Sequence, residues 1–300
     1  LGFKSDRVKT TPATSDQRRI LFIGDSFTEG LGFEHAKTFG GKIAAALAVQ
    51  DVEVFNAGVS SYSPIIYWRK AKYLIEDVGL QFQEMVVYID ISDIEDEAKF
   101  YRLTDQGTVT RLKRKPDHVN QDHDPGEPRG WSIKKFLRDR TVLTYFLINM
   151  AHDAVYGSAD SKKLSTGRAR ARWTVDETLL DFYGRDGLAR AAENMTRLYE
   201  LLSTHGIRLT IAVYPWPDQI VSTDLDSIQV SFWREWSDAN DSRFLNFFPC
   251  FITEEEGVSV LEVYFIPGDV HWNDRGHELI AEQFLRFEQD NMETAACCCK

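Results

Sequence analysis

"RRILFIGDSFTEG", residues 18–30, decides how this chain folds, because an apolar run changes abruptly there into a turn that carries a serine. Residues 20–24 show no polar alternation, which is typical of a strand covered on both faces. Asp25 and Ser26 follow at once, and Gly30 comes shortly after. Two interpretations are open. The turn is a plain strand end, or it holds a serine hydroxyl at the carboxyl end of a sheet, where ligands of α/β proteins bind.

Further apolar runs repeat this pattern along the chain and alternate with segments of helical periodicity. We predict strands at 20–24, 52–55, 85–89, 207–214 and 244–247. Ser63 before Pro64 is a typical helix start, and Asn273 precedes the last predicted helix in the same way. Strands that alternate with helices predict an α/β fold with a parallel central sheet and helices on both faces.

The composition is that of a globular protein and argues against nucleic acid as the main partner. Of the 300 residues, 43% are hydrophobic and 27% are charged, and the formal net charge is −11. No run of about 18 apolar residues occurs, so we expect no membrane span. Residues 1–17 are polar and predict a linker. We expect an unseen preceding segment to provide any membrane association, and favour a periplasmic or extracytoplasmic location.

One segment interrupts the alternation of strands and helices. Residues 98–172 hold 16 lysines and arginines against eight acids, and we interpret 98–180 as an insertion in a single domain that spans 18–290. Within it, 136–156 has a helical pattern. The loop that contains His118 and His123 has residue types that can ligate metals, but their spacing fits no strong metal motif. We therefore expect no metal and no cofactor.

The cysteines give no disulfide framework. One lies inside the folded part, and the other three are the neighbours 297–299 at the end of the chain, without interleaved histidines. We expect 291–300 to be a disordered tail of no assigned role. The sequence leaves the oligomeric state open.

A serine nucleophile needs a base, usually a histidine that a carboxylate orients. Asp269 and His271 lie two residues apart in an extended segment before the last helix, so their side chains point to the same side and can meet. The bland alternative is a purely structural Asp–His pair. His277 lies in the first turn of the last helix, at a position that allows it to face solvent.

Four segments together resemble the ordered blocks of the SGNH/GDSL hydrolase superfamily. They are "GDSFTEG" (24–30), "NAGVSSYSP" (56–64), "DISDIEDE" (90–97) and "DVHWNDRGH" (269–277). The resemblance covers about residues 19–288 in order, although only the blocks are specific. It implies a flavodoxin-like three-layer α/β/α sandwich that carries a Ser–His–Asp triad.

Matched position by position, this resemblance makes Ser26 the nucleophile, His271 the general base and Asp269 the residue that orients it. It also implies an oxyanion hole built from the backbone N–H groups of Ser26 and Gly58. The family's third block commonly reads Gly-x-Asn-Asp, whose asparagine is a further donor. Here Ser92 stands at the asparagine position as the candidate third donor.

The chain departs from the family in two further ways. Asp90 stands at the glycine position of the third block, and Asp93 follows Ser92. The last block has one residue between Asp269 and His271 where the family commonly has two. This Asp-x-His-Trp form resembles the variant of bacterial polysaccharide acetyltransferases and acetylesterases, which favours acyl groups on carbohydrate as substrate.

The resemblance predicts an ester hydrolase that forms an acyl-serine and acts on acylated carbohydrate or a small ester. Two alternatives stay open: an O-acetyltransferase that acts on a polysaccharide, and a catalytically silent protein that binds carbohydrate or a partner. A nucleotide-binding protein is disfavoured, because no glycine-rich phosphate loop with lysine follows the first strand. The side chains that we predict to contact substrate are Asp25, Asn56, Asp93 and Trp272. The tryptophans considered for stacking on sugar rings, although core packing is the more common role, are Trp131, Trp216, Trp233, Trp236 and Trp272.

Overall fold

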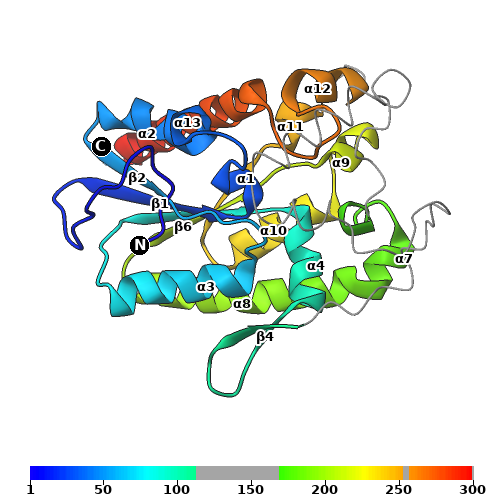
Figure 1. Ribbon diagram of the computed structural model, residues 1–300, viewed down its shortest axis with the longest axis horizontal. Coiled ribbons are helices and arrows are strands. Elements are labelled where there is room, and N and C mark those ends of the chain that lie inside the picture. The colour runs from blue at the N-terminus through cyan, green and yellow to red at the C-terminus, as the bar shows by residue number, and fades with distance from the viewer. Residues whose placement is uncertain (113–168, 253–256, 299–300) are drawn as a thin grey trace, which may run out of the picture. The chain divides into compact units, whose positions relative to one another are not determined.

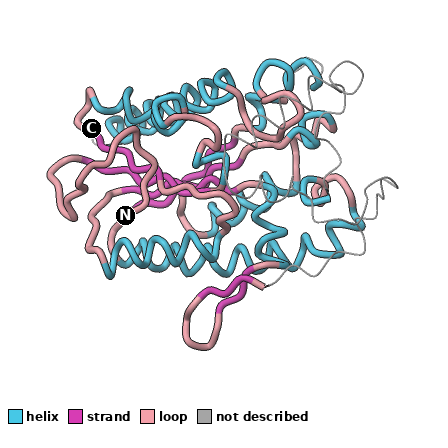
Figure 2. Tube along the Cα trace, viewed as in Figure 1, coloured by secondary structure: helices cyan, strands magenta, loops and turns pink. Residues whose placement is uncertain are grey.

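The computed structural model describes residues 1–112, 169–252 and 257–298 (Figures 1 and 2). Its contacts divide the chain into one compact unit, made of residues 1–112 and 165–300, and a second unit, 113–164. The second unit lies outside the described residues. The predicted helix at 136–156 and the loop of His118 and His123 belong to it.

Five parallel strands form the central sheet, in the order β2-β1-β3-β6-β7. The strands are β1 (Arg18–Gly24), β2 (Val52–Asn56), β3 (Glu84–Ile89), β6 (Arg208–Val213) and β7 (Arg243–Asn246). All five predicted strands are therefore present, within one or two residues of their predicted bounds. The strand order is that of flavodoxin-like folds.

Helices cover both faces of this sheet, which confirms the predicted three-layer α/β/α sandwich (Figure 1). The longer helices are α2 (Phe39–Ala48), α3 (Pro64–Lys72), α4 (Ile91–Lys99), α8 (Arg185–Thr204), α10 (Ile228–Ala239), α12 (Gly257–Tyr264) and α13 (Asp274–Cys298). In Figure 1, α2 and α13 lie on one side of the sheet, and α3 and α8 lie on the other. The shorter ones are α1 (Ser26–Glu29), α7 (Glu177–Leu179), α9 (Pro217–Val221) and α11 (Phe248–Phe251). Short 3-10 helices form η1 (His35–Lys37) and η3 (Ala169–Ala171), and π-helical turns form η2 (Tyr73–Asp77) and η4 (Leu180–Gly184).

The regions outside the sandwich differ in part from a simple linker, insertion and tail. The backbone N–H of Lys4 donates to the carbonyl of Asn56 at 2.8 Å, so the N-terminal segment touches the edge strand β2. Within 98–180, the described residues form the antiparallel hairpin of β4 (Tyr101–Leu103) and β5 (Val109–Arg111). At the other end, the backbone of α13 continues through the predicted tail as far as Cys298.

The core is a set of aromatic rings packed against β1. Phe22 is fully buried and contacts the rings of Phe39, Tyr88 and Phe284 at centroid distances of 6.1, 5.5 and 5.1 Å. Ring pairs of this kind stabilise the fold beyond the effect of the apolar area that they bury. They attach β1 to α2 and α13 on one face of the sheet, and so fix the strand whose end carries Ser26.

The amino end of the sheet is held by buried charges. Glu84 of β3 is fully buried and forms ion pairs with Arg18, Arg208 and Arg243. Arg18 also pairs with Glu288 of α13 at 2.7 Å. Pairing of this kind offsets the cost of burying an ionised carboxylate. This network ties four neighbouring strands, β1, β3, β6 and β7, to the last helix at the end of the sheet opposite Ser26.

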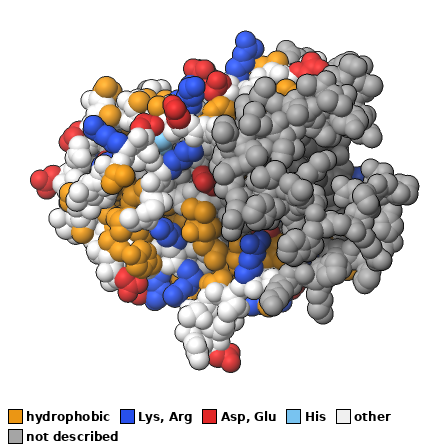
Figure 3. Space-filling view, viewed as in Figure 1, with side chains coloured by type: hydrophobic (Ala, Val, Ile, Leu, Met, Phe, Trp, Pro, Cys, Tyr) orange, Lys and Arg blue, Asp and Glu red, His pale blue; other side chains and the backbone are white. Residues whose placement is uncertain are grey.

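Basic and acidic side chains are interspersed on the face of the molecule drawn in Figure 3. None of the helices within the described ranges is both long and apolar enough to cross a bilayer.

We predict that Phe22→Ala lowers the free energy of unfolding by about 3–5 kcal/mol, because a cavity opens among three rings. Phe182→Ala is the matched control, since Phe182 is 66% exposed, and should cost under about 1 kcal/mol. Denaturant unfolding of the two variants checks the difference. Equal midpoints would show that the ring cluster around β1 is not the main support of the sheet.

Candidate active site

The parallel register brings the carboxyl ends of neighbouring strands to one edge of the sheet. Gly24 of β1 pairs with Tyr88 of β3, and Ile89 of β3 pairs with Val213 of β6. The residues that follow these strands therefore meet, although they are far apart in the sequence. They include Ser26 after β1, Asp90 after β3, and Tyr214 and Trp216 after β6.

Ser26 is the first residue of α1, a single helical turn directly after β1. The carboxylate of Asp25 caps this turn by accepting the backbone N–H of Phe27 at 2.9 Å. Gly30 ends the turn with φ 67°, a left-handed conformation that favours glycine. A side chain at Gly24 would overlap Thr28 and the carbonyl of Tyr88. The glycines around Ser26 are thus required by this sharp turn.

His271 and Asp269 lie in a short turn before α13. The backbone N–H of Ile266 donates to the carbonyl of His271 at 2.9 Å, and that of Asp269 donates to the carbonyl of Ile266 at the same distance. Asn273 then caps α13 as predicted, because its side-chain oxygen accepts the N–H groups of Arg275 and Gly276. The apolar run before this turn, at 260–265, is mainly the end of helix α12.

The turn brings His271 to Ser26 across 245 residues of sequence. The Nε2 atom of His271 lies 2.8 Å from the Oγ atom of Ser26, and its Nδ1 atom lies 2.7 Å from Oδ1 of Asp269. The imidazole also packs against the ring of Phe27 at a centroid distance of 4.7 Å. The structure therefore brings the three predicted triad residues into one chain of hydrogen bonds.

The electrostatics of Asp269 decide which nitrogen of His271 carries the proton. Burial opposes ionisation of Asp269, but hydrogen bonds from His271 and from the backbone outweigh it, and the pKa of Asp269 falls to about 2. An ionised carboxylate can only accept. Nδ1 of His271 is therefore the donor, and Nε2 presents its lone pair to the hydroxyl of Ser26.

The three predicted oxyanion donors differ in their surroundings. Within the described residues, no acceptor pairs with the backbone N–H of Ser26. The N–H of Gly58, by contrast, donates to Oδ1 of Asn56 at 2.9 Å. Ser92 is buried, its N–H donates to Asp90, and none of the described residues forms a hydrogen bond with its hydroxyl. The N–H of Ser26 and the hydroxyl of Ser92 are therefore donors without an acceptor among the described residues.

The side chains predicted to contact substrate are instead buried supports of the site. Asn56 is 1% exposed and donates to the carbonyl of Thr28 at 2.6 Å. Trp272 is fully buried, with its ring beside those of Phe27 and Tyr214. Asp25 and Asp93 are 3% and 0% exposed. The prediction of substrate contacts is corrected here: these groups satisfy polar atoms inside the protein or fill its core.

The candidate sugar-stacking tryptophans are also mainly core residues. Trp216 and Trp233 are buried with Trp272, whereas Trp236 is half-buried and Trp131 lies outside the described residues. His277 does not face solvent either. It is 2% exposed, it accepts the N–H of Phe39 at 3.3 Å, and burial lowers its pKa to about 3.

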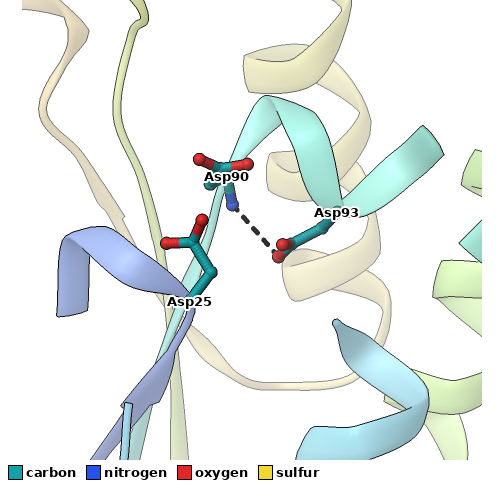
Figure 4. A group of neighbouring side chains, drawn as sticks. All are labelled: Asp25, Asp90 and Asp93. Atoms are coloured by element: carbon teal, nitrogen blue, oxygen red, sulfur yellow. Dashed lines mark hydrogen bonds between the residues drawn. The ribbon is translucent and has the colours of Figure 1, made fainter. Parts of the chain in front are cut away.

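A group of three buried aspartates lies beside Ser26 and is a feature that the sequence interpretation missed. Oxygens of Asp25, Asp90 and Asp93 lie within 4.8 Å of one another, and the three carboxyl groups turn toward one another (Figure 4). The one signal in the sequence was an aspartate, Asp90, at the family's glycine position. Burial, reinforced by Asp90, raises the pKa values of Asp25 and Asp93 well above the usual range.

Such a group can in principle hold a metal ion or protons, and most of its oxygens already accept hydrogen bonds from the protein. Trp216 and the N–H of Ser92 donate to the two oxygens of Asp90. Tyr67 donates to Oδ2 of Asp93 at 2.8 Å, which leaves Oδ1 of Asp93 as the only one of the six oxygens without a hydrogen-bond partner among the described residues.

No protein-family model and no curated protein sequence matches the chain. Solved structures do align with it. The psychrotrophic esterase EstA of Pseudoalteromonas sp. aligns over 92% of this chain and 100% of its own, at 9% identity and a TM-score of 0.49. A catalytic mutant of Axe2, an acetylxylan esterase from Geobacillus stearothermophilus, aligns over 92% and 95%, at 13% identity and 0.48. A GDSL-like lipase from Bacteroides thetaiotaomicron aligns over 91% and 89%, at 12% identity and 0.43. At these values the likeness carries no argument about the site.

We predict that Asp269 makes the stability of the protein depend on pH in the acid range. As the pH falls from about 5 to about 2, the unfolded chain takes up this proton first, so the free energy of unfolding decreases. Because the side chain is 38% exposed, solvent screening limits the effect to about 1 kcal/mol. Asp269→Asn should flatten this part of the stability profile.

The control is Asp274→Asn, which removes an exposed acid from the same segment. Urea unfolding at several pH values gives the slopes. Parallel slopes for wild type and Asp269→Asn would contradict the depressed pKa of Asp269.

Proposed function

We propose that this chain is a serine esterase of the SGNH/GDSL type, which cleaves acyl esters through an acyl-serine intermediate. The observation that carries the proposal is the hydrogen-bonded series from Ser26 through His271 to Asp269, with links of 2.8 and 2.7 Å. A nucleophile, a base within hydrogen-bond reach and a group that orients the base are the parts that acyl transfer needs. All three lie at the carboxyl edge of the sheet.

Each proton of the proposed reaction has a place in this geometry. Nε2 of His271 takes the hydroxyl proton as Oγ of Ser26 attacks the acyl carbonyl, and the imidazolium that forms is stabilised by the ionised Asp269. The same proton then passes to the leaving alcohol as the ester bond breaks. Water repeats the sequence on the acyl-serine: His271 deprotonates it, the acid leaves, and Ser26 recovers its proton.

The tetrahedral intermediate places a negative charge on the former carbonyl oxygen, which needs donors aimed at it. We assign the uncommitted N–H of Ser26 and the hydroxyl of Ser92 to this role. The N–H of Gly58 can join them only if it turns from, or is shared with, Oδ1 of Asn56, to which it donates at 2.9 Å.

The proposed substrate is an acylated carbohydrate or a small ester, an assignment that rests on the Asp-x-His-Trp form of the last block. If a sugar hydroxyl replaces water in the second step, the same acyl-serine makes the protein an O-acyltransferase. Product analysis with and without a sugar acceptor separates these outcomes. If the chain is instead a catalytically silent binding protein, Ser26 should not react with a fluorophosphonate probe.

We predict that Ser26→Ala and His271→Ala each lower kcat on an aryl acetate by about 10⁴-fold or more, and that the double variant is little worse. Once one residue of the triad is removed, the other no longer contributes to the rate, so its loss has little further effect. Asp269→Asn should cost less than either. The measurement is kcat for the three single variants and the double variant, with labelling by the fluorophosphonate probe beside it.

Labelling of wild type but not of Ser26→Ala is the expected control result. Effects of Ser26→Ala and His271→Ala that multiply in the double variant would show that the two residues do not act together. Equal labelling of wild type and Ser26→Ala would overturn the esterase proposal itself.

We predict that Ser92→Ala lowers kcat by about 10²-fold while KM changes little, because a donor to the developing oxyanion acts only in the transition state. Its hydroxyl has no hydrogen-bond partner among the described residues, so the melting temperature should stay within about 2 °C. Ser203→Ala on the exposed end of α8 is the control. A loss in kcat under about threefold would remove Ser92 from the oxyanion hole.

A further inference from the structure

The hydroxyl of Ser26 faces two acceptors. Nε2 of His271 lies 2.8 Å from its Oγ atom, and Oδ2 of Asp25 lies 3.2 Å from the same atom. A hydroxyl has one proton to donate. If Asp25 were an ordinary carboxylate, it would compete with His271 for that proton. It would also place a negative charge beside the oxygen that must attack.

The neighbour of Asp25 across the sheet edge is Asp90, and the two carboxyl groups are too close and too buried to be charged together. They are 3% and 0% exposed, and their oxygens lie within 4.8 Å (Figure 4). The donors around them are unequal. Both oxygens of Asp90 accept N–H groups, from Ser92 and from Trp216, whereas Oδ2 of Asp25 faces the hydroxyl of Ser26.

We propose that Asp25 and Asp90 form a carboxyl pair that holds one proton between them beside Ser26, and that this proton keeps Asp25 from competing with His271 for the Ser26 hydroxyl. Asp25 is thus a positioning residue of the reaction proposed above, on which this inference rests. Asp90, which stands where the family has glycine, is the group that keeps the proton there.

Charged and titratable groups face this pair from every element around it. They are Asp93 and Asp96 on α4, Tyr67 on α3, Arg170 on η3 and Tyr214 after β6. His271, before α13, contacts the same serine as Asp25. Burial and then Asp90 raise the pKa of Asp25, whereas the N–H of Phe27 and the charge of Arg170 lower it. The pKa values of Tyr67 and Tyr214 are raised by burial and by the aspartates, which favours the neutral form of these phenols.

The sign of the pH effect follows. Below the apparent pKa of the pair, one proton is present and Ser26 donates to His271. As the pH rises through that value, the proton is lost, Asp25 becomes a carboxylate beside Oγ, and kcat falls. The pH profile of the enzyme should therefore have an alkaline limb that belongs to Asp25 and Asp90 as a coupled pair.

The test is the pH profile of kcat on an aryl acetate from about pH 5 to about pH 10, normalised for each protein to its own maximum. Asn is as good a helix cap as Asp, and in Asp25→Asn its amide stays neutral at all pH values. In wild type, kcat should fall by about tenfold along the alkaline limb. In Asp25→Asn this fall should be absent. A limb that stays unchanged in Asp25→Asn overturns the proposal.

The matched control is Asp96→Asn, which removes another buried acid of α4. Burial raises the pKa of Asp96 to about 7, and its partner is Arg170 rather than Ser26. This variant should keep the alkaline limb. If Asp96→Asn loses the limb and Asp25→Asn keeps it, the titrating group is Asp96 rather than Asp25, and the proposal is overturned.

A second variant tests the role of Asp90. Asparagine at this position would point an amide at the indole N–H of Trp216, so Asp90→Asn is combined with Trp216→Phe, and Trp216→Phe alone is the reference. Without the charge of Asp90, Asp25 ionises more easily, and the alkaline limb should move down by about one pH unit or more. A limb that stays in place would show that Asp90 does not hold the proton.

An infrared measurement separates this inference from the esterase proposal. The infrared difference spectrum, wild type minus Asp25→Asn, should contain the C=O stretching band of a protonated carboxyl group at neutral pH. This band should disappear as the pH rises through the alkaline limb. If wild type neither hydrolyses esters nor reacts with the fluorophosphonate probe, the proposed function fails, while the band still decides whether the pair holds a proton. Absence of the band overturns the pair whatever the activity.

Discussion

The parallel hydrogen-bond register of β1 with β2 and β3 is the constraint on which the rest of this structure depends. Parallel strands end at the same edge of a sheet, so the register that pairs Gly24 with Tyr88 also brings Ser26 next to Asp90. The helices that close both faces leave the turns at this edge as the place where polar groups gather. His271 then needs only a short turn before α13 to reach Ser26.

The two ends of the sheet treat buried charge in opposite ways. At the amino end, Glu84 is surrounded by arginines and stays paired. At the carboxyl end, Asp25, Asp90 and Asp93 crowd together, and among the described residues Arg170 is the cation that acts on this group. Arginines surround the acid at the amino end, whereas at the carboxyl end burial and neighbouring acids raise the pKa values of Asp25 and Asp93. Perturbed acids in a site of this kind are the ones that chemistry can use.

The departures from the family motif are connected through the third block. An aspartate in place of glycine at position 90 caps α4, accepts a hydrogen bond from the indole N–H of Trp216 and faces Asp25. Its neighbour Ser92 has the hydroxyl that takes the place of an asparagine amide. Tyr67 and the N–H of Asp90 occupy the carboxylate of Asp93. One turn of helix therefore carries both the candidate oxyanion donor and the acid that governs the proton on Asp25.

The sequence by itself determined the five strands, the start of α3 after Ser63, the cap at Asn273, and the pairing of Asp269 with His271. Apolar periodicity and neighbouring positions along the chain are local signals. The ordered blocks also singled out Ser26. Only the tertiary structure decided which polar groups are buried together. Trp272 and His277 turned inward, Asn56 took the N–H of Gly58, and Asp25 met Asp90. Burial and proton affinity depend on what other strands place beside a residue, and no local pattern in the chain records those neighbours.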